Sequence, residues 1–166
     1  PDSSLMNTPC TLTRLALALA ALGTLASTAF AQPTIPDSHR INGFALGCQA
    51  YTFNRFTAFE AIEKTAQAGA KVIEFYPGQR LSKEDPTLKV GHDSPDVDTV
   101  IAKLQAKLAQ HGLKAVNYGV VGIPKDEMAA RKVFEFAKKM GLIAVTTESA
   151  DAINTIEKLA VEYDIQ

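Results

Sequence analysis

The chain has 166 residues, of which 17 are basic and 18 are acidic, so its formal net charge is −1. This balance, with no basic stripe or arginine cluster, disfavours nucleic acid as the main partner. The hydrophobic fraction of 46% is that of an ordinary globular protein.

Residues 1–31 are typical of an export signal. Met6 begins a segment in which Arg14 precedes an apolar run, Leu15–Leu22, and Ala29-Phe30-Ala31 matches an A-x-A cleavage site. The run is shorter than the roughly 20 residues that a membrane span needs. We therefore expect cleavage after Ala31, no stable membrane anchor and a periplasmic or extracellular location. Residues 1–5 precede Met6 and are interpreted as extra upstream residues.

Residues 32–42 contain two prolines and little apolar periodicity, and are predicted to form a linker. From residue 43 the chain repeats one pattern, an amphipathic helix followed by a stop and a short apolar strand. Gly69, Gly112 and Gly141 provide the first three stops, whereas the fourth, Tyr163-Asp164-Ile165-Gln166, lacks a glycine. Strands that alternate with helices predict an α/β domain with a parallel sheet and right-handed crossovers.

Four strands are predicted in this repeat, and Ile165 is expected to begin a fifth. Thr57 should cap the first helix, with Glu60 completing a capping box. A long polar loop is predicted from Gln79 to Asp93. The second helix is expected to start at Ser94-Pro95-Asp96, where a cap is followed by proline and an acid. The predicted strands are 44–51, 72–76, 114–118 and 142–147.

Polar side chains follow every predicted strand. In parallel sheets the strand ends meet at one rim, where ligands bind. Such a set of donors and acceptors suits a hydroxyl-rich ligand. The set includes Gln49, Tyr51, Glu74, Tyr76, Asn117, Tyr118, Thr146 and Glu148.

Two carboxylates are the first candidates for chemistry. Glu74 interrupts the apolar strand Val72-Ile73-Glu74-Phe75, and a buried carboxylate needs either a partner or a function. The structural alternative is a salt bridge inside a barrel, for example with a lysine from a strand beyond residue 166. Glu148 follows the fourth strand and could bind a metal or substrate. Its alternative is a first-turn carboxylate favoured by the helix dipole.

Three tyrosines and one histidine complete the candidate substrate site. Tyr51, Tyr76 and Tyr118 could form the walls of a sugar site, although tyrosine is common at the rim of any such sheet. His92 lies in the long loop on the same side. A solvated loop histidine is the alternative for His92.

Two stretches, Gly47–Phe53 and Ala68–Phe75, resemble the sugar phosphate isomerase/epimerase family, which are xylose isomerase-like TIM barrels. The joints His111–Lys114 and Lys139–Leu142 are also similar to that family. The resemblance implies a (β/α)8 barrel, of which residues 43–166 would be the first four βα units. We therefore expect a chain truncated at its C-terminus, with roughly four further units beyond residue 166.

The resemblance also implies a reaction. Family members move a proton beside the carbonyl of a sugar, with a carboxylate as acid/base and a divalent metal (Mn, Mg, Zn or Co) that polarises oxygen. On this interpretation Glu74 is the catalytic candidate and Glu148 an accessory metal ligand, with the main ligands beyond residue 166. The expected substrate-binding residues are Gln49, Tyr51, Tyr76, His92, Asn117 and Tyr118. Residues 43–166 alone are not expected to be active, and the full-length protein could be a homo-oligomer.

Two other functions fit parts of the sequence. The first is a non-catalytic secreted carbohydrate-binding protein, either a degenerate barrel or a doubly wound periplasmic binding domain. The second is a metal-dependent phosphodiesterase on the same barrel, similar to apurinic endonucleases. Export and the absence of a basic patch disfavour the phosphodiesterase.

Overall fold

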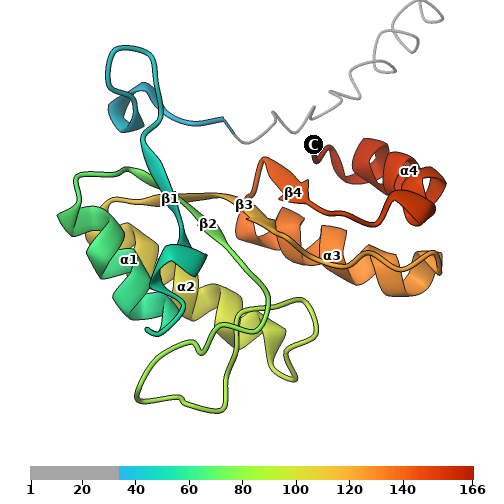
Figure 1. The fold of residues 1–166 in the computed structure, drawn as a ribbon, viewed down its shortest axis with the longest axis horizontal. Helices are drawn as coiled ribbons and strands as arrows, with labels where there is room; N and C mark the ends of the chain where they lie inside the picture. Colours follow the sequence, from blue (N-terminus) through green and yellow to red (C-terminus); the bar gives the residue numbers. More distant parts are fainter. Residues whose placement is uncertain (1–33) are drawn as a thin grey trace, which may run out of the picture. The chain divides into compact units, whose positions relative to one another are not determined.

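In the computed structural model, which describes residues 34–166, four parallel strands alternate with four α-helices (Figure 1). The predicted signal segment, residues 1–31, and the start of the predicted linker lie outside the described residues. No helix in the described part of the chain is long and apolar enough to cross a membrane. The strands are β1 (Gly47–Gln49), β2 (Val72–Phe75), β3 (Lys114–Gly119) and β4 (Ala144–Thr146). The helices are α1 (Ala58–Gln67), α2 (Val97–His111), α3 (Glu127–Met140) and α4 (Ile153–Tyr163), with short 3-10 turns η1 (Asp37–His39), η2 (Ala50–Phe53) and η3 (Ala150–Ala152).

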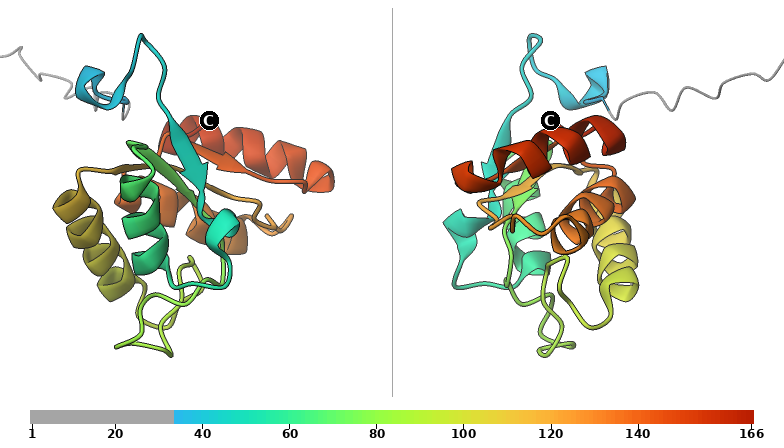
Figure 2. Two further views of the ribbon diagram at one scale, coloured as in Figure 1. Left: turned by 60° about the vertical axis from the view of Figure 1, so that its left-hand side comes forward. Right: turned by 90° about the vertical axis from the view of Figure 1, so that its right-hand side faces the viewer.

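The strands follow one another in the sheet in chain order, β1-β2-β3-β4, and all three pairs are parallel. Because right-handed crossovers that always advance in one direction lie on one face of a sheet, the opposite face stays uncovered by them. Consecutive helices pack against each other, α1 on α2, α2 on α3 and α3 on α4 (Figures 1 and 2). The predicted parallel α/β arrangement is confirmed for the described residues.

The core lies between the sheet and these helices. Ile73 and Phe75 of β2 and Tyr118 of β3 are buried, together with Leu104 of α2 and Val133 of α3. Each of these side chains is at most 1% exposed. The apolar side chains of the helices therefore pack on the face of the sheet from which Phe75 and Tyr118 project.

Three helices of the repeat end at a residue in the left-handed conformation. Gly112 and Gly141 follow α2 and α3 in the left-handed conformation, with φ of 63° and 68°. In this region a residue with a Cβ is strained and glycine is not. Asp164 takes the same conformation after α4, with φ of 56°. The joint that lacks a glycine thus has the same geometry, provided by an aspartate.

Residue 166 already pairs with the edge of the sheet. The backbone nitrogen of Gln166 donates to the carbonyl of Ile143 at 2.9 Å, and its own carbonyl accepts from Val145 at 2.8 Å. These two bonds to one residue are the pattern of a parallel ladder. The backbone of Gln166 thus pairs with β4 where the fifth strand is predicted, while the sheet of the described residues has four strands.

The long loop between β2 and α2 is packed against the domain. Leu81 and Val90 are fully buried, and Arg80 pairs with Lys89 in an antiparallel bridge. The carbonyls of Arg80 and Leu81 accept from the first backbone nitrogens of α1, at 2.8 and 3.1 Å. The loop therefore satisfies donors that a helix N-terminus leaves unpaired.

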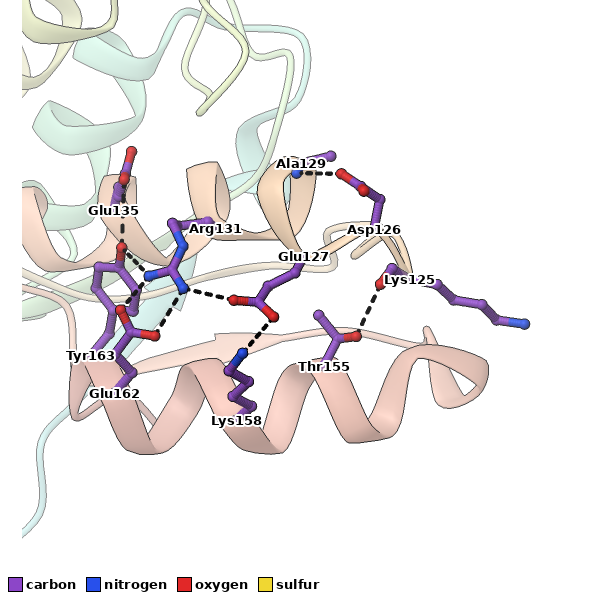
Figure 3. A network of polar contacts seen from close by, with 10 residues as sticks. All are labelled: Lys125, Asp126, Glu127, Ala129, Arg131, Glu135, Thr155, Lys158, Glu162 and Tyr163. Carbon is purple, nitrogen blue, oxygen red and sulfur yellow. Dashed lines mark hydrogen bonds and ion pairs between the residues drawn. The ribbon is translucent and has the colours of Figure 1, made fainter.

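Helices α3 and α4 are joined by an ionic network around Arg131 (Figure 3). Its guanidinium donates to Glu127 at 2.9 Å and to the Tyr163 hydroxyl at 3.1 Å, and it forms two bonds with Glu162. These carboxylates hold the pKa of Arg131 above its usual range. The network links the last described helix to the rest of the domain.

Candidate functional site

Three polar side chains form a row across the sheet, on the face opposite the core. Gln49 is the register partner of Glu74, and Glu74 is the partner of Asn117. Register partners in neighbouring strands project to the same face, and adjacent residues project to opposite faces. Since Phe75 and Tyr118 face the helices, Glu74 and Asn117 face away from them. All three side chains of this polar row are half-buried.

The Gln49 side chain connects Glu74 with the end of β3. Its Nε2 atom donates to Glu74 Oε1 and to the carbonyl oxygen of Gly119, each at 3.3 Å. An amide nitrogen carries two hydrogens, so both are used. The amide oxygen of Gln49 and the second carboxylate oxygen of Glu74 are then the acceptors left for a ligand.

The Asn117 side chain forms its hydrogen bonds within the sheet. Its Nδ2 donates to Thr146 Oγ1 at 2.7 Å, and its Oδ1 accepts from the backbone nitrogen of Tyr118 at 2.9 Å. Gly119 lies so close to β4 that a Cβ there would come within 2.4 Å of the Thr146 carbonyl oxygen. The end of β3 is therefore fixed against β4, and with it the carbonyl that Gln49 contacts.

Two pockets lie along this row. The first, here called the rim pocket, has a volume of about 440 Å³. The second, the inner pocket, has about 230 Å³ and contains Glu74. Gln49 lines both. The rim pocket is lined by Gln49, Tyr51, Tyr76, Pro77, Gly119 and Val120, and the inner pocket by Gly47, Cys48, Gln49, Val72, Ile73, Glu74 and Val116.

Two tyrosines form one wall of the rim pocket. The rings of Tyr51 and Tyr76 meet edge to face, with centroids 5.0 Å apart, and Tyr51 is 57% exposed. Burial, with a smaller contribution from Tyr51, raises the pKa of Tyr76. The Tyr76 phenol therefore keeps its proton near neutral pH and can donate a hydrogen bond.

His92 and Tyr118 form a separate pair. The His92 Nδ1 atom lies 3.3 Å from the Tyr118 hydroxyl, and the Tyr118 ring packs on Phe136 with centroids 4.8 Å apart. Burial lowers the pKa of His92 and raises that of Tyr118. His92 lines a pocket of about 280 Å³ that also includes Lys132 of α3. The structure thus places both residues away from the rim and inner pockets.

Glu148 is exposed in the turn after β4 and lines neither the rim pocket nor the inner pocket. Within residues 34–166, no three His, Cys, Asp or Glu side chains gather in a group that could hold a metal. The main ligands that the resemblance implies are expected beyond residue 166, so the divalent metal stays a prediction.

Two other pockets of similar size lie on the outside of α1 and α2, with volumes of about 450 and 410 Å³. Their walls carry lysines already paired with carboxylates, such as Lys107 with Glu63 at 2.5 Å and Lys83 with Glu60 at 2.7 Å. Ligands of parallel α/β folds bind beyond the carboxyl ends of the strands. The rim pocket lies at these ends and is therefore the candidate site, together with the inner pocket, which shares Gln49 with it along the sheet.

Of the residues that the sequence predicts for the site, Gln49, Tyr51, Glu74 and Tyr76 line these two pockets. Sequence reasoning did not identify Gly119, whose carbonyl orients Gln49. The signal was a glycine at the carboxyl end of a predicted strand, where a backbone can approach a neighbour closely.

No protein-family model and no curated protein sequence matches the chain. Two crystal structures from Parabacteroides distasonis ATCC 8503 are similar to it. An uncharacterised protein is 30% identical, with a TM-score of 0.65 over 74% of this chain and 51% of that one. A sugar phosphate isomerase/epimerase is 11% identical, with a TM-score of 0.50 over 72% of this chain and 48% of that one.

The chain therefore spans about half the length of these two proteins. At 11% identity, the likeness to the isomerase/epimerase shows a shared fold alone. The predicted resemblance is confirmed to that extent: the parallel sheet of residues 34–166 is similar to part of the fold of a protein of the expected class.

Proposed function

We propose that these residues belong to a sugar isomerase or epimerase that moves a proton beside a carbonyl group. The observation that carries the proposal is the Glu74 carboxylate, held by the Gln49 amide at the carboxyl ends of parallel strands. An acid/base group must be fixed within reach of the reacting carbon. The fold shared with a sugar phosphate isomerase/epimerase supports the choice of reaction.

A (β/α)8 barrel is the architecture proposed for the whole protein. The strands advance through the sheet without reversal, which is the order a closed barrel needs and a doubly wound sheet abandons at its switch point. The pairing of Gln166 beside β4 supports a sheet that continues past the fourth strand. In a barrel the polar row would face the interior, and the rim pocket would open at the catalytic end.

The proton balance of the reaction is simple. The Glu74 carboxylate takes a proton from the carbon next to the carbonyl, leaving an enediolate whose negative charge resides on oxygen. The Tyr76 hydroxyl, which keeps its proton, is a hydrogen-bond donor for that oxygen. When the remaining hydroxyl proton passes from one oxygen of the enediolate to the other and the carbon-bound proton returns to the neighbouring carbon, the product is the isomer. Delivery of a proton to the opposite face of the first carbon, by a group on that face, gives the epimer.

The test uses the product of the complete open reading frame that contains these residues. Incubated in D₂O with ketoses and aldoses, it should exchange the hydrogen beside the carbonyl for deuterium, as read by proton NMR. Glu74→Gln is expected to reduce the exchange rate by at least about a hundredfold, the usual contribution of an acid/base group. Glu84→Gln, in the loop near α1, should keep the wild-type rate. A wild-type protein that exchanges none of these sugars contradicts the proposal.

A non-catalytic carbohydrate-binding role is the second candidate. The exposed Tyr51 ring beside Tyr76 favours it, because an aromatic face can hold a sugar without any proton transfer. In that case sugar binding is retained while deuterium exchange is absent in the wild type. Export stays a prediction for both candidates, and the divalent metal stays a prediction for the isomerase or epimerase alone.

A further inference from the structure

The hydrogen-bonding groups that line the two pockets favour one kind of sugar ligand over another. We propose that the site takes an uncharged, hydroxyl-rich ligand, a neutral sugar or polyol, in preference to a sugar phosphate. This inference rests on the proposed function for the sugar class, and it goes further in choosing between neutral and phosphorylated members.

The free hydrogen-bonding atoms of Gln49 and Glu74 are acceptors. Both hydrogens of the Gln49 amide are used, by Glu74 and by the Gly119 carbonyl. What Gln49 and Glu74 offer a ligand in the two pockets is therefore the Gln49 amide oxygen and the second Glu74 carboxylate oxygen, which are acceptors. A hydroxyl group donates to such atoms, whereas an ionised phosphoryl group is itself an acceptor and leaves them unsatisfied.

The negative charge of Glu74 also disfavours a phosphoryl group. The Glu74 carboxylate lies on the wall of the inner pocket and is half-buried. A second negative charge at about 4 Å is repelled enough to weaken binding by at least about fivefold, even at the dielectric constant of water. The repulsion grows as the surroundings become less polar. A phosphoryl group that enters the inner pocket is therefore disfavoured.

The wall formed by Tyr51 and Tyr76 suits the apolar face of a sugar ring. The Tyr51 and Tyr76 rings meet edge to face in one wall of the rim pocket, and Tyr51 leaves more than half of its surface exposed. The apolar C–H face of a sugar ring can pack on such a surface while its hydroxyls reach Gln49 and Glu74. The rim pocket, at about 440 Å³, lies within the range of small-molecule sites.

Saturation-transfer NMR on the product of the complete open reading frame tests the proposal, with a panel of neutral pentoses and hexoses and a panel of their phosphates as probes. We expect transfer to neutral sugars and at least about fivefold less to the phosphates. Stronger or equal transfer to the phosphates overturns the neutral-ligand inference and leaves the proposed sugar reaction standing. Transfer to neither panel overturns both.

Two variants, Glu74→Gln and Tyr51→Ala, locate the cause, and Glu84→Gln is the control. Glu74→Gln keeps the size of the side chain and removes its charge, so transfer to the phosphates should rise relative to that of the neutral sugars. Glu84→Gln removes a carboxylate from the loop near α1 and should change neither. If Glu74→Gln leaves saturation transfer to the sugar phosphates unchanged, the Glu74 carboxylate does not exclude them. Tyr51→Ala should reduce the neutral-sugar signal several-fold, and an unchanged signal overturns the part assigned to the tyrosine wall.

Discussion

The amide nitrogen of Gln49, at the end of β1, lies 3.3 Å from the carbonyl oxygen of Gly119, at the end of β3. The side chain thus reaches across the intervening strand β2, where it also contacts Glu74. One residue holds the ends of three strands and the candidate carboxylate in a single geometry.

Gln49→Ala is expected to lower the free energy of unfolding by about 1 kcal/mol, because two half-buried hydrogen bonds are lost. Gln49→Glu should lower it further, since a carboxylate can donate to neither the Glu74 carboxylate nor the Gly119 carbonyl. Urea denaturation of the three proteins measures the differences. If Gln49→Glu matches the wild type in stability, the described contacts do not hold the strand ends.

Gly119→Ala should destabilise the protein by about 1–3 kcal/mol, the usual cost of forcing a group into a packed site. The added Cβ would meet the Thr146 carbonyl oxygen at 2.4 Å and the Thr146 Cβ at 2.7 Å, so backbone must move. Gly122→Ala is the matched control, because a Cβ at Gly122 has no neighbour within 4 Å. Its effect should stay within about 0.5 kcal/mol. Equal effects of the two substitutions would contradict the close approach of β3 and β4.

Arg131→Ala should lower the melting temperature by a few degrees at low salt, since α3 and α4 lose their shared contact with Glu127, Glu162 and Tyr163. The loss should shrink at high salt, because these charges are near the surface and are screened. Lys125→Ala, which breaks an exposed pair with Asp151, is the control and should have little effect. A loss at Arg131 that is independent of salt would point to packing instead of charge.

His92 should make stability depend on pH. Its pKa in the folded protein is lowered from 6.5 by burial and by Lys132, with Asp93 acting in the opposite direction. As the pH falls below 6.5 the unfolded chain therefore takes up the proton first, and the free energy of unfolding decreases until the lower folded pKa is passed. In His92→Gln this part of the pH dependence should be absent. Denaturant titrations across this range measure it, and an unchanged slope in the variant would contradict the burial of the imidazole.

Local signals of the sequence were sufficient for the helix ends. Thr57 and Glu60 form the predicted capping box, because each side chain only has to reach a backbone nitrogen three residues away. The start of α2 was harder to place, since Ser94 and Asp96 are both good caps. The structure uses Asp96, two residues later than the predicted start.

Side-chain direction was less predictable. Asn117 and Tyr118 were both expected at the rim, yet neighbouring residues in a strand face opposite sides, and Tyr118 is in the core. The position of His92 depends on the course of the long loop, which is set by hydrogen bonds to α1. Such contacts join distant parts of the chain and leave no local pattern in the sequence.

The most direct test of the candidate site is a titration of the ¹⁵N-labelled chain with the neutral sugar that gives the strongest saturation transfer. We predict that the shifted amide signals centre on Gln49, Tyr51 and Gly119. Shifts centred instead on Lys103 and Lys107, in the pocket outside α1 and α2, would contradict the account.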